Sequence, residues 1–218
     1  MTDSIWPQPD PTVNLLNNAR QGDEHAIEQL LTRHRDALKR MIDMRLDKRV
    51  AQRIDVSDIV QEVLVEASRR LQQYLENPAM PFHLWIRQIA KDRIIDAHRR
   101  HRVSAKRSVD RERRLELQGP PDASTIELAG QLLDPSLTPA ARATQREMAI
   151  QVQACIDQLD ERDRDILLMR HYEQLSNQEV AQALGLTEPA ASMRYLRALK
   201  RLRAAIAGAT SDFQDDNA

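Results

Sequence analysis

The chain has 218 residues, 41% of them apolar, and its 32 Lys and Arg residues nearly balance its 33 Asp and Glu residues, for a net charge of −1. A single cysteine, Cys155, excludes an internal disulfide, and no apolar run approaches the ~20 residues of a membrane span, so we expect a cytoplasmic protein without membrane insertion. The near-zero net charge alone would argue against a nucleic-acid partner, but charge is distributed unevenly along the chain.

Apolar residues recur at helical spacing, alternating β-strand patterns are absent, and aromatic residues make up 3% of the chain. We therefore predict an all-α protein of two small helical domains joined by a flexible linker. The predicted parts are an extended N-terminal arm (1–12), a first helical domain (13–102), the linker (103–140), a second helical domain (141–207) and a C-terminal tail (208–218).

The N-terminal region combines an arm with two long amphipathic patterns. Three prolines in the first eleven residues indicate an extended, loosely ordered arm. The first pattern has a predicted break around Gly22, and Asp55 is the expected cap of the second. The apolar positions are Ala26, Ile27, Leu30, Leu31, Leu38, Met41, Ile42 and Leu46, and then Val56, Ile59, Val60, Val63, Leu64, Ala67 and Leu71.

The helix after Asp55 also has a polar face. Its members are spaced by three and four residues and so project from one side: Asp58, Gln61, Glu62 and Glu66. This pattern fits an acidic docking face, and it equally fits an ordinary solvated face.

A third helical pattern follows the loop 77–81 and runs into the basic sequence HRRHR at 98–102. Its apolar positions are Phe82, Trp85, Ile86, Ile89, Ala90 and Ile94. From 98 to 114 there are eight Lys and Arg residues against two acids, whereas 115–140 holds four acids and no Lys or Arg. Four of the ten prolines and two of the five glycines fall within 119–139, which predicts the linker.

The C-terminal region carries the signals of a helix-turn-helix. Cys155 lies in an apolar stripe and is expected in the core. Ser176 and Glu179 predict a capping box at a helix start, Gly185 a left-handed helix end, and Thr187 the cap of the next helix.

The helix after Thr187 has one apolar stripe, and its basic residues lie outside that stripe. The stripe consists of Ala191, Tyr195, Leu199, Leu202 and Ile206. Five basic residues against Glu188 give the segment 187–203 a charge of +4. Such a helix fits the major groove of B-DNA, although a solvated basic face would show the same pattern.

Three segments together resemble an extracytoplasmic-function sigma factor of bacterial RNA polymerase: DVSDIVQEVLVEASRRL, FHLWIRQIAKDRIIDAHRRHR and the terminal helix-turn-helix. The resemblance covers roughly 13–102 and 140–207. It implies a specificity subunit that binds core RNA polymerase through its β′ coiled coil and β flap and directs it to promoter DNA. It also implies that Asp58, Gln61 and Glu62 bind the β′ coiled coil.

The resemblance further implies that the helix from Phe82 faces the minus-10 element and helps to melt it. The loop 74–81 would lie near a pocket for an extruded base, and Trp85 fits core packing better than base stacking. The implied DNA-binding residues are Gln88, Asp92, Arg99, Arg100 and Arg102. Asp92 departs from the family, in which asparagine is common, and it could instead pair with Arg93 or Arg99.

The resemblance assigns the helix-turn-helix to the minus-35 element as duplex. The implied contacts are Thr187, Ser192, Arg194, Arg197, Lys200 and Arg201. Ser192 stands where a basic residue is common, so we expect a weaker or different base preference there, and Lys200 fits a phosphate contact or a solvated charge.

Catalytic classes fit poorly. The six histidines are scattered, no paired cysteines offer a metal site, and five glycines form no phosphate-binding loop, so we expect no enzyme activity, metal or cofactor. Two alternatives stay open: a two-domain regulator that binds duplex DNA without being a polymerase subunit, and an adaptor that binds another regulator. The sequence also leaves open whether an anti-sigma factor binds the chain.

Overall fold

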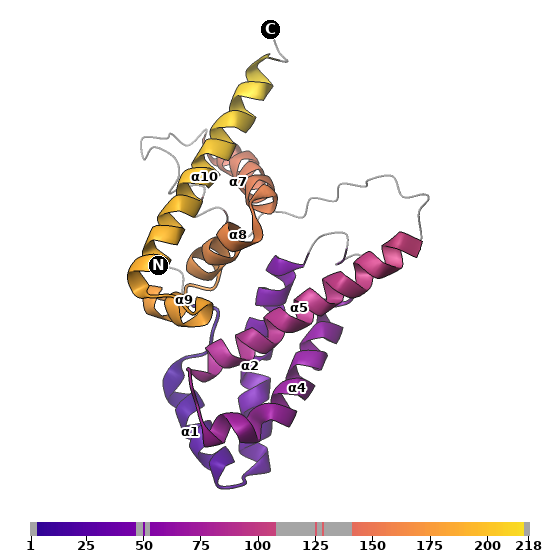
Figure 1. Ribbon diagram of the computed structural model, residues 1–218, viewed down its shortest axis with the longest axis vertical. Coiled ribbons are helices and arrows are strands. Elements are labelled where there is room, and N and C mark those ends of the chain that lie inside the picture. Colours follow the sequence, from indigo (N-terminus) through magenta and orange to yellow (C-terminus); the bar gives the residue numbers. More distant parts are fainter. Residues whose placement is uncertain are drawn as a thin grey trace. The chain divides into compact units, whose positions relative to one another are not determined.

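The structure is a computed structural model that describes residues 4–46, 50, 53–107, 125, 128 and 141–215, with the side chains of 101–107, 141–147 and 209–215 outside this description. All regular secondary structure in these ranges is helical, which confirms the predicted all-α class (Figure 1). The chain divides into two compact units, Ile5–Arg113 and Arg114–Ala218, the latter together with the first four residues.

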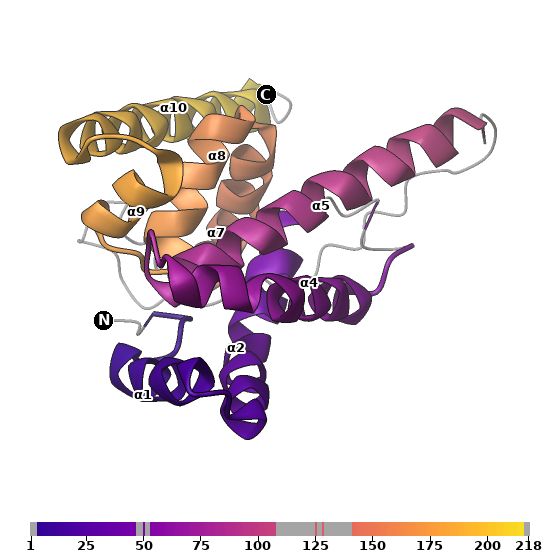
Figure 2. The same ribbon diagram turned by 60° about the horizontal axis from the view of Figure 1, so that its bottom comes forward.

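Four helices form the first unit: α1 (Pro9–Arg20), α2 (Glu24–Arg45), α4 (Val56–Glu76) and α5 (Phe82–Arg107). Helices α2, α4 and α5 pack against one another, and α1 packs mainly on α2 (Figure 2). The largest side chains in this core are fully buried: Leu30, Leu38, Met41, Ile42, Ile59, Leu84 and Ile86.

Two predicted boundaries in this unit are confirmed. Gly22 has φ +86°, a left-handed conformation that separates α1 from α2. Asp55 caps α4, because its carboxylate accepts a hydrogen bond of 2.8 Å from the backbone N–H of Ser57. Asp23 caps α2 in the same way, accepting from His25 and Ala26.

The predicted extended arm is wrong over its last four residues. Helix α1 already begins at Pro9, within 1–12, and Trp6 is buried with its ring 6.0 Å from that of His83. A proline suits the first turn of a helix, where its missing N–H would have no helical partner and its φ is already helical. Two of the three prolines that indicated an extended arm, Pro9 and Pro11, therefore lie in the first turn of a helix.

One histidine lies in the core of this unit. His34 is fully buried, donates from Nδ1 to the carbonyl of Leu30 over 2.8 Å, and meets the edge of Phe82 at a centroid distance of 4.9 Å. Burial lowers the pKa of His34 from 6.5 to about 4, because the charged imidazolium would lose its hydration. The ring is therefore neutral at physiological pH.

The second unit contains α7 (Ala141–Gln158), α8 (Glu161–Leu167), the π-helical turn η1 (Leu168–Tyr172), α9 (Asn177–Leu184) and α10 (Glu188–Asp215). Helix α10 packs along α7, α8 and α9 (Figures 1 and 2). Its described core includes Val152, Ile156, Ile166, Leu167, Met169, Val180, Ala198 and Leu202. Cys155 is 5% exposed within this core, as predicted, and burial raises the pKa of its thiol.

The predicted linker differs from the structure at two places. Helix α5 continues to Arg107, past the predicted start at 103, because residues 103–107 contain neither proline nor glycine. Thr125 and Leu128 are helical and buried, and the Thr125 hydroxyl lies 2.7 Å from that of Tyr172. The rest of the predicted linker, 108–124, 126–127 and 129–140, lies outside the described residues.

Helix α10 extends to Asp215, so it takes up most of the predicted tail 208–218. Across the described ranges, no helix combines the length and the apolar character that crossing a membrane requires.

Candidate nucleic-acid and partner interface

The polar face of α4 is presented at the surface of the first unit. Asp58 and Gln61 are exposed, and the side chain of Glu62 is 40% exposed. Val65, which is 49% exposed, lies on the same side of the helix because it follows Asp58 by seven residues. We call Asp58, Gln61, Glu62 and Val65 the α4 face.

Glu62 is not a free carboxylate in this structure. It accepts from both terminal guanidinium nitrogens of Arg100 on α5, at distances of 3.1 to 3.3 Å. The pair joins one residue predicted to bind polymerase to one predicted to bind DNA. Because the two side chains are 40% and 57% exposed, water screens the pair, and its contribution is about 1 kcal/mol or less.

Glu66, included in the acidic pattern, instead holds α4 to α5. Its side chain is only 16% exposed and pairs with Arg70 at 2.5 Å and with Arg93 of α5 at 3.2 Å. A carboxylate committed to these two guanidinium groups is poorly available to a partner. Glu66 therefore belongs to the packing between the two helices.

Helix α5 exposes a second candidate face. Gln88, Asp92 and Arg99 are exposed, and Ile95, 48% exposed, lies among them. Arg102 lies in α5, but its side chain is outside the described residues. We call Gln88, Asp92, Ile95 and Arg99 the α5 face.

Asp96 takes the pairing role suggested for Asp92. Arg99 pairs with Asp96 at 3.3 Å, and Arg93 pairs with Glu66 at 3.2 Å and with Asp96 at 3.9 Å. In the ion pairs of the described chain, the suggested partners of Asp92 are thus occupied by other acids. Asp92 stays at the exposed surface.

Aromatic side chains pack at the start of α5 and hold the preceding loop. The ring of Trp85 lies 4.7 Å from that of Tyr74 and 5.3 Å from that of Phe82, which agrees with the preference for packing. The Tyr74 hydroxyl donates to the carbonyl of Met80 over 3.0 Å, which ties the loop 77–81 to α4. Burial raises the pKa of Tyr74.

In the second unit, the predicted helix-turn-helix signals are confirmed. The Ser176 hydroxyl accepts from the N–H of Glu179 at 3.2 Å, and the Glu179 carboxylate accepts from the N–H of Ser176 at 2.7 Å. Gly185 has φ +63°, and Thr187 caps α10 by accepting from the N–H of Ala190 at 3.4 Å. Asn177 also bridges the two helices, donating to the carbonyl of Glu188 at 3.1 Å.

Helix α10 buries one side and exposes the other. Ala191, Ala198 and Leu202 are fully buried, whereas Arg197 and Lys200 are exposed and Ser192 and Arg194 are partly exposed. Ala198 was missing from the predicted apolar stripe. Its methyl group allows close approach of α10 to its neighbours, a role that small size rather than hydrophobicity signals.

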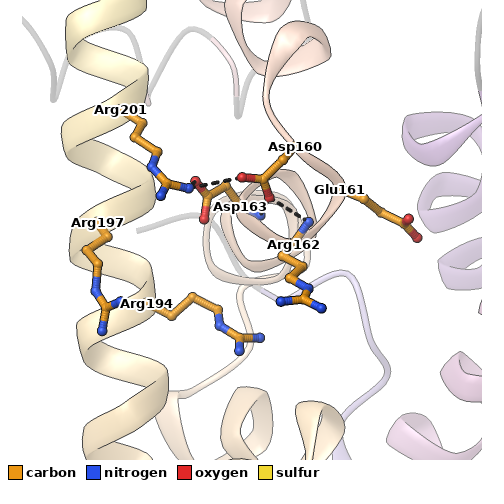
Figure 3. Close-up of a pocket in the computed structure, with 7 residues that line it drawn as sticks. All are labelled: Asp160, Glu161, Arg162, Asp163, Arg194, Arg197 and Arg201. Carbon is orange, nitrogen blue, oxygen red and sulfur yellow. Dashed lines mark hydrogen bonds and ion pairs between the residues drawn. The ribbon is translucent and has the colours of Figure 1, made fainter.

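Arg201 is held by the N-terminal end of α8. Its guanidinium pairs with Asp160 at 3.0 Å and with Asp163, which is only 4% exposed (Figure 3). The hydrogen bond that Arg201 donates to Asp163 raises the pKa of Arg201. Asp160 is also the cap of α8, so this pair fixes α10 to a helix terminus.

Arg194 and Arg197 line a pocket of about 550 Å³ that also includes Arg162 and Arg201. In Figure 3, Arg194 extends from α10 beside Arg162, whereas Glu161 points away from α10. Because Asp160 and Asp163 are engaged by Arg201, the remaining guanidinium groups are open to an anion such as a DNA phosphate.

Four apolar residues on the candidate faces are exposed, although apolar residue types do not by themselves indicate a surface position: Val65, Ile95, Met193 and Leu196. Each interrupts the polar side of its helical pattern, which is the signal that could have identified it. Within the described ranges, no group of three or more His, Cys, Asp or Glu side chains is arranged to hold a metal ion.

Two family models match the chain: Sigma-70 region 2 over residues 30–103 and Sigma-70, region 4 over residues 149–202. The chain is 27% identical over 190 residues to RNA polymerase sigma factor CnrH of Cupriavidus metallidurans, covering 87% of this chain and 91% of the relative. It is 26% identical over 195 residues to ECF RNA polymerase sigma factor SigD of Mycobacterium bovis, covering 89% and 84%.

A solved structure of CnrH in complex with the cytosolic domain of CnrY has a similar fold. The TM-score is 0.56 at 23% identity, and the match covers 91% of this chain and 99% of that chain. At this level of identity the likeness supports a shared fold. The first family model contains α4 and the described face of α5, and the second contains the whole of α8 and α9 and most of the described face of α10.

Proposed function

Because this chain belongs to the extracytoplasmic-function sigma factors of bacterial RNA polymerase, we propose that it binds core polymerase, directs it to promoters through minus-10 and minus-35 elements, and assists promoter melting. The proposal assigns polymerase and minus-10 binding to residues 13–102 and minus-35 binding to 141–207. It implies a cytoplasmic protein that acts without a catalytic site of its own.

One observation carries the proposal. In the part matched by Sigma-70 region 2, two adjacent helices carry side chains of opposite charge at the surface. Helix α4 presents Asp58 and Glu62, and α5 presents Arg99 and Arg100. Opposite charges on neighbouring helices suit two partners of opposite charge. Asp58 and Glu62 would meet a basic protein surface, and Arg99 and Arg100 would meet DNA phosphates.

Docking of polymerase would rest on Asp58, Gln61 and Glu62. Because Glu62 is paired with Arg100 in the free chain, binding requires the exchange of one exposed ion pair for another. Such an exchange costs little, since exposed pairs contribute about 1 kcal/mol or less. It would also release Arg100 for DNA.

Minus-10 recognition would use the α5 face with Arg100 and Arg102. The packed rings of Tyr74, Phe82 and Trp85 hold the loop 77–81 in position. A loop held in this way favours a defined site for an extruded nucleobase. Extrusion costs a few kcal/mol, and contacts to the base and its phosphates must offset that cost.

Minus-35 recognition would use α10, with Arg197 and Lys200 toward the duplex and Arg194 at the pocket beside α8. Thr187 and Ser192 lie at the start of the same helix and are available to phosphates or base edges. Arg201 would act mainly by holding α10 in place, because it is engaged by Asp160 and Asp163.

The chain would also be controlled by an anti-sigma factor. This part of the proposal rests on the fold shared with CnrH, which was solved bound to the cytosolic domain of CnrY. Competition between a purified anti-sigma candidate and core polymerase for this chain tests it, and simultaneous binding of both would contradict it.

The deciding experiment is run-off transcription from a random-promoter library with core polymerase, with and without the protein, followed by sequencing of the transcript starts. We expect protein-dependent starts that share two spaced upstream elements. Duplex binding by the protein alone with no protein-dependent start would instead identify a regulator that is not a polymerase subunit. An adaptor would show neither activity.

A further inference from the structure

The side of α10 opposite its buried stripe carries two apolar residues. Met193 is 51% exposed and Leu196 is 56% exposed, the two highest values among the large hydrophobic side chains of the described chain. They lie one turn apart, at i and i+3, within the first three turns of α10. We call Met193 and Leu196 the apolar pair.

The position of the apolar pair follows from helical geometry. Ala191, Ala198 and Leu202 are fully buried and define the inner side of α10. Met193 precedes Arg197 by four residues and Lys200 by seven, so these three lie together on the outer side. The apolar pair therefore points away from the core of its unit and belongs to the surface that the helix-turn-helix presents.

A single exposed leucine needs no explanation, since much of any protein surface is apolar. Two exposed large apolar residues on successive turns, beside two exposed cations, are less easily dismissed. The segment of α10 from Pro189 to Ala204, which includes the apolar pair and both of these cations, contains no Asp or Glu. An apolar pair framed only by positive charge suits a polyanion that also offers apolar groups.

Duplex DNA meets this description in its major groove. Each thymine presents a 5-methyl group there, and apolar side chains contact that group, whereas hydrogen-bonding side chains read the other base edges. Neither a thioether nor an isobutyl group can donate a conventional hydrogen bond. Discrimination by the apolar pair must then come from shape and methyl contact.

We propose that Met193 and Leu196 read thymine 5-methyl groups in the minus-35 element, while Arg197 and Lys200 beside them bind a guanine edge or phosphates. The inference rests on the proposed function, since it assumes that α10 enters the groove. It adds a specificity that the charged residues alone do not supply, because phosphate contacts carry no direct sequence information.

The test replaces thymine by deoxyuridine in the minus-35 element recovered from the promoter library. This change removes one methyl group per site and leaves base pairing intact. With polymerase holoenzyme containing the unaltered chain, affinity should fall about three- to fivefold at one or two specific thymines, as expected for one buried methyl group. The remaining thymines should tolerate the change.

Two variants then identify the reading residues. For Leu196→Ala or Met193→Ala, affinity for the thymine-containing element should fall by a similar factor, and deoxyuridine at the matching site should have no further effect. Val13→Ala truncates a similarly exposed residue on α1. In this variant, the ratio of the affinity for the thymine-containing element to the affinity for the deoxyuridine-containing element should stay the same as in the unaltered chain. Thermal unfolding of each variant controls for folding, and alanine is a good helix former.

The outcomes separate this inference from the proposed function. Loss of minus-35 binding in Arg197→Ala, together with an unchanged thymine-to-deoxyuridine ratio in both apolar variants, would overturn the inference and leave the function intact. A recovered minus-35 element with no thymine on either strand would overturn it as well. If none of the α10 variants affected promoter selection, the assignment of α10 to the groove would be wrong.

Discussion

The two units hold their surface charges in different ways. In the first unit, Glu62 and Arg100 pair while both side chains are substantially exposed, at 40% and 57%. In the second, Arg201 pairs with Asp163, which is almost completely buried. The first pair can open to admit a partner, whereas the second fastens a helix to its neighbour. Burial of one member thus separates the Arg201–Asp163 pair, which maintains the fold, from the Glu62–Arg100 pair, whose charges are available for binding.

The largest expected effect follows from reversing the open charges on α4. Asp58→Lys combined with Glu62→Lys should weaken binding to core polymerase about 100-fold or more, since like charges would face each other in the docked complex. Equilibrium binding to purified core polymerase measures this. The unfolding temperature should change little, because both positions are exposed.

The matched control is Glu28→Lys combined with Asp36→Lys, which makes the same charge change at exposed positions of α2. It should bind polymerase normally. Equal loss in both double variants would show that net charge, rather than the α4 face, controls docking.

Acid should affect the first unit strongly, because its core contains His34. The unfolded chain takes up a proton on this histidine below about pH 6.5, whereas burial keeps the folded-state pKa near 4. The contribution of neutral His34 to the free energy of unfolding is therefore fully present above pH 6.5. It decreases by roughly 3 kcal/mol as the pH falls toward 4. His34→Leu should flatten the dependence of unfolding free energy on pH in this window.

The exposed His25 provides the comparison, since its side chain is 74% exposed. His25→Leu should leave the pH dependence as it is in the unaltered chain. If His34→Leu behaved the same way, the buried imidazole would not be the group that titrates.

A smaller effect is expected on α10, where available and engaged arginines can be compared directly. Arg194→Ala and Arg197→Ala should each weaken minus-35 duplex binding by about 1 to 3 kcal/mol. Arg201→Ala should change direct duplex contacts less and lower the unfolding temperature instead. Promoter-binding titrations and thermal unfolding of the three variants check both parts. The reverse ranking would make Arg201 the main DNA contact.

The smallest effects concern the two acids in isolation. Asp163→Asn removes the buried charge that engages Arg201 and should lower the unfolding temperature by roughly 2 to 4 °C. Glu62→Gln removes an exposed partner and should shift it by less than about 1 °C. Scanning calorimetry of both variants provides the measurement, and equal shifts would remove the distinction between the two pairs.

Local signals in the sequence predicted local structure well. The capping box at Ser176, the left-handed Gly185 and the caps at Asp55 and Thr187 each depend on residues within four positions of one another. The start of α1 was missed because proline favours both extended chain and the first helical turn. Burial of Trp6 against His83, far along the chain, decides between the two.

The sequence predicted which polar residues form the candidate faces, but it did not predict which of their charged side chains are ion-paired. Whether Glu62 is free or paired depends on Arg100, 38 positions away, and the engagement of Arg201 by Asp163 spans the same separation. Helical periodicity reports the side of a helix on which a residue lies, not the neighbour that it meets across a tertiary contact. The exposed apolar residues Val65, Ile95, Met193 and Leu196 lie outside the predicted apolar stripes, and helical periodicity assigned them no role.

The burial of Cys155 has a practical consequence for experiments on this protein. It is the sole cysteine of the chain, and its thiol is both covered by the core and held in the protonated form, which reacts slowly with maleimides and iodoacetamides. A cysteine introduced at an exposed position of α4 or α10 would react much faster. Fluorophores or spin labels can therefore be attached at chosen positions in the otherwise unaltered chain.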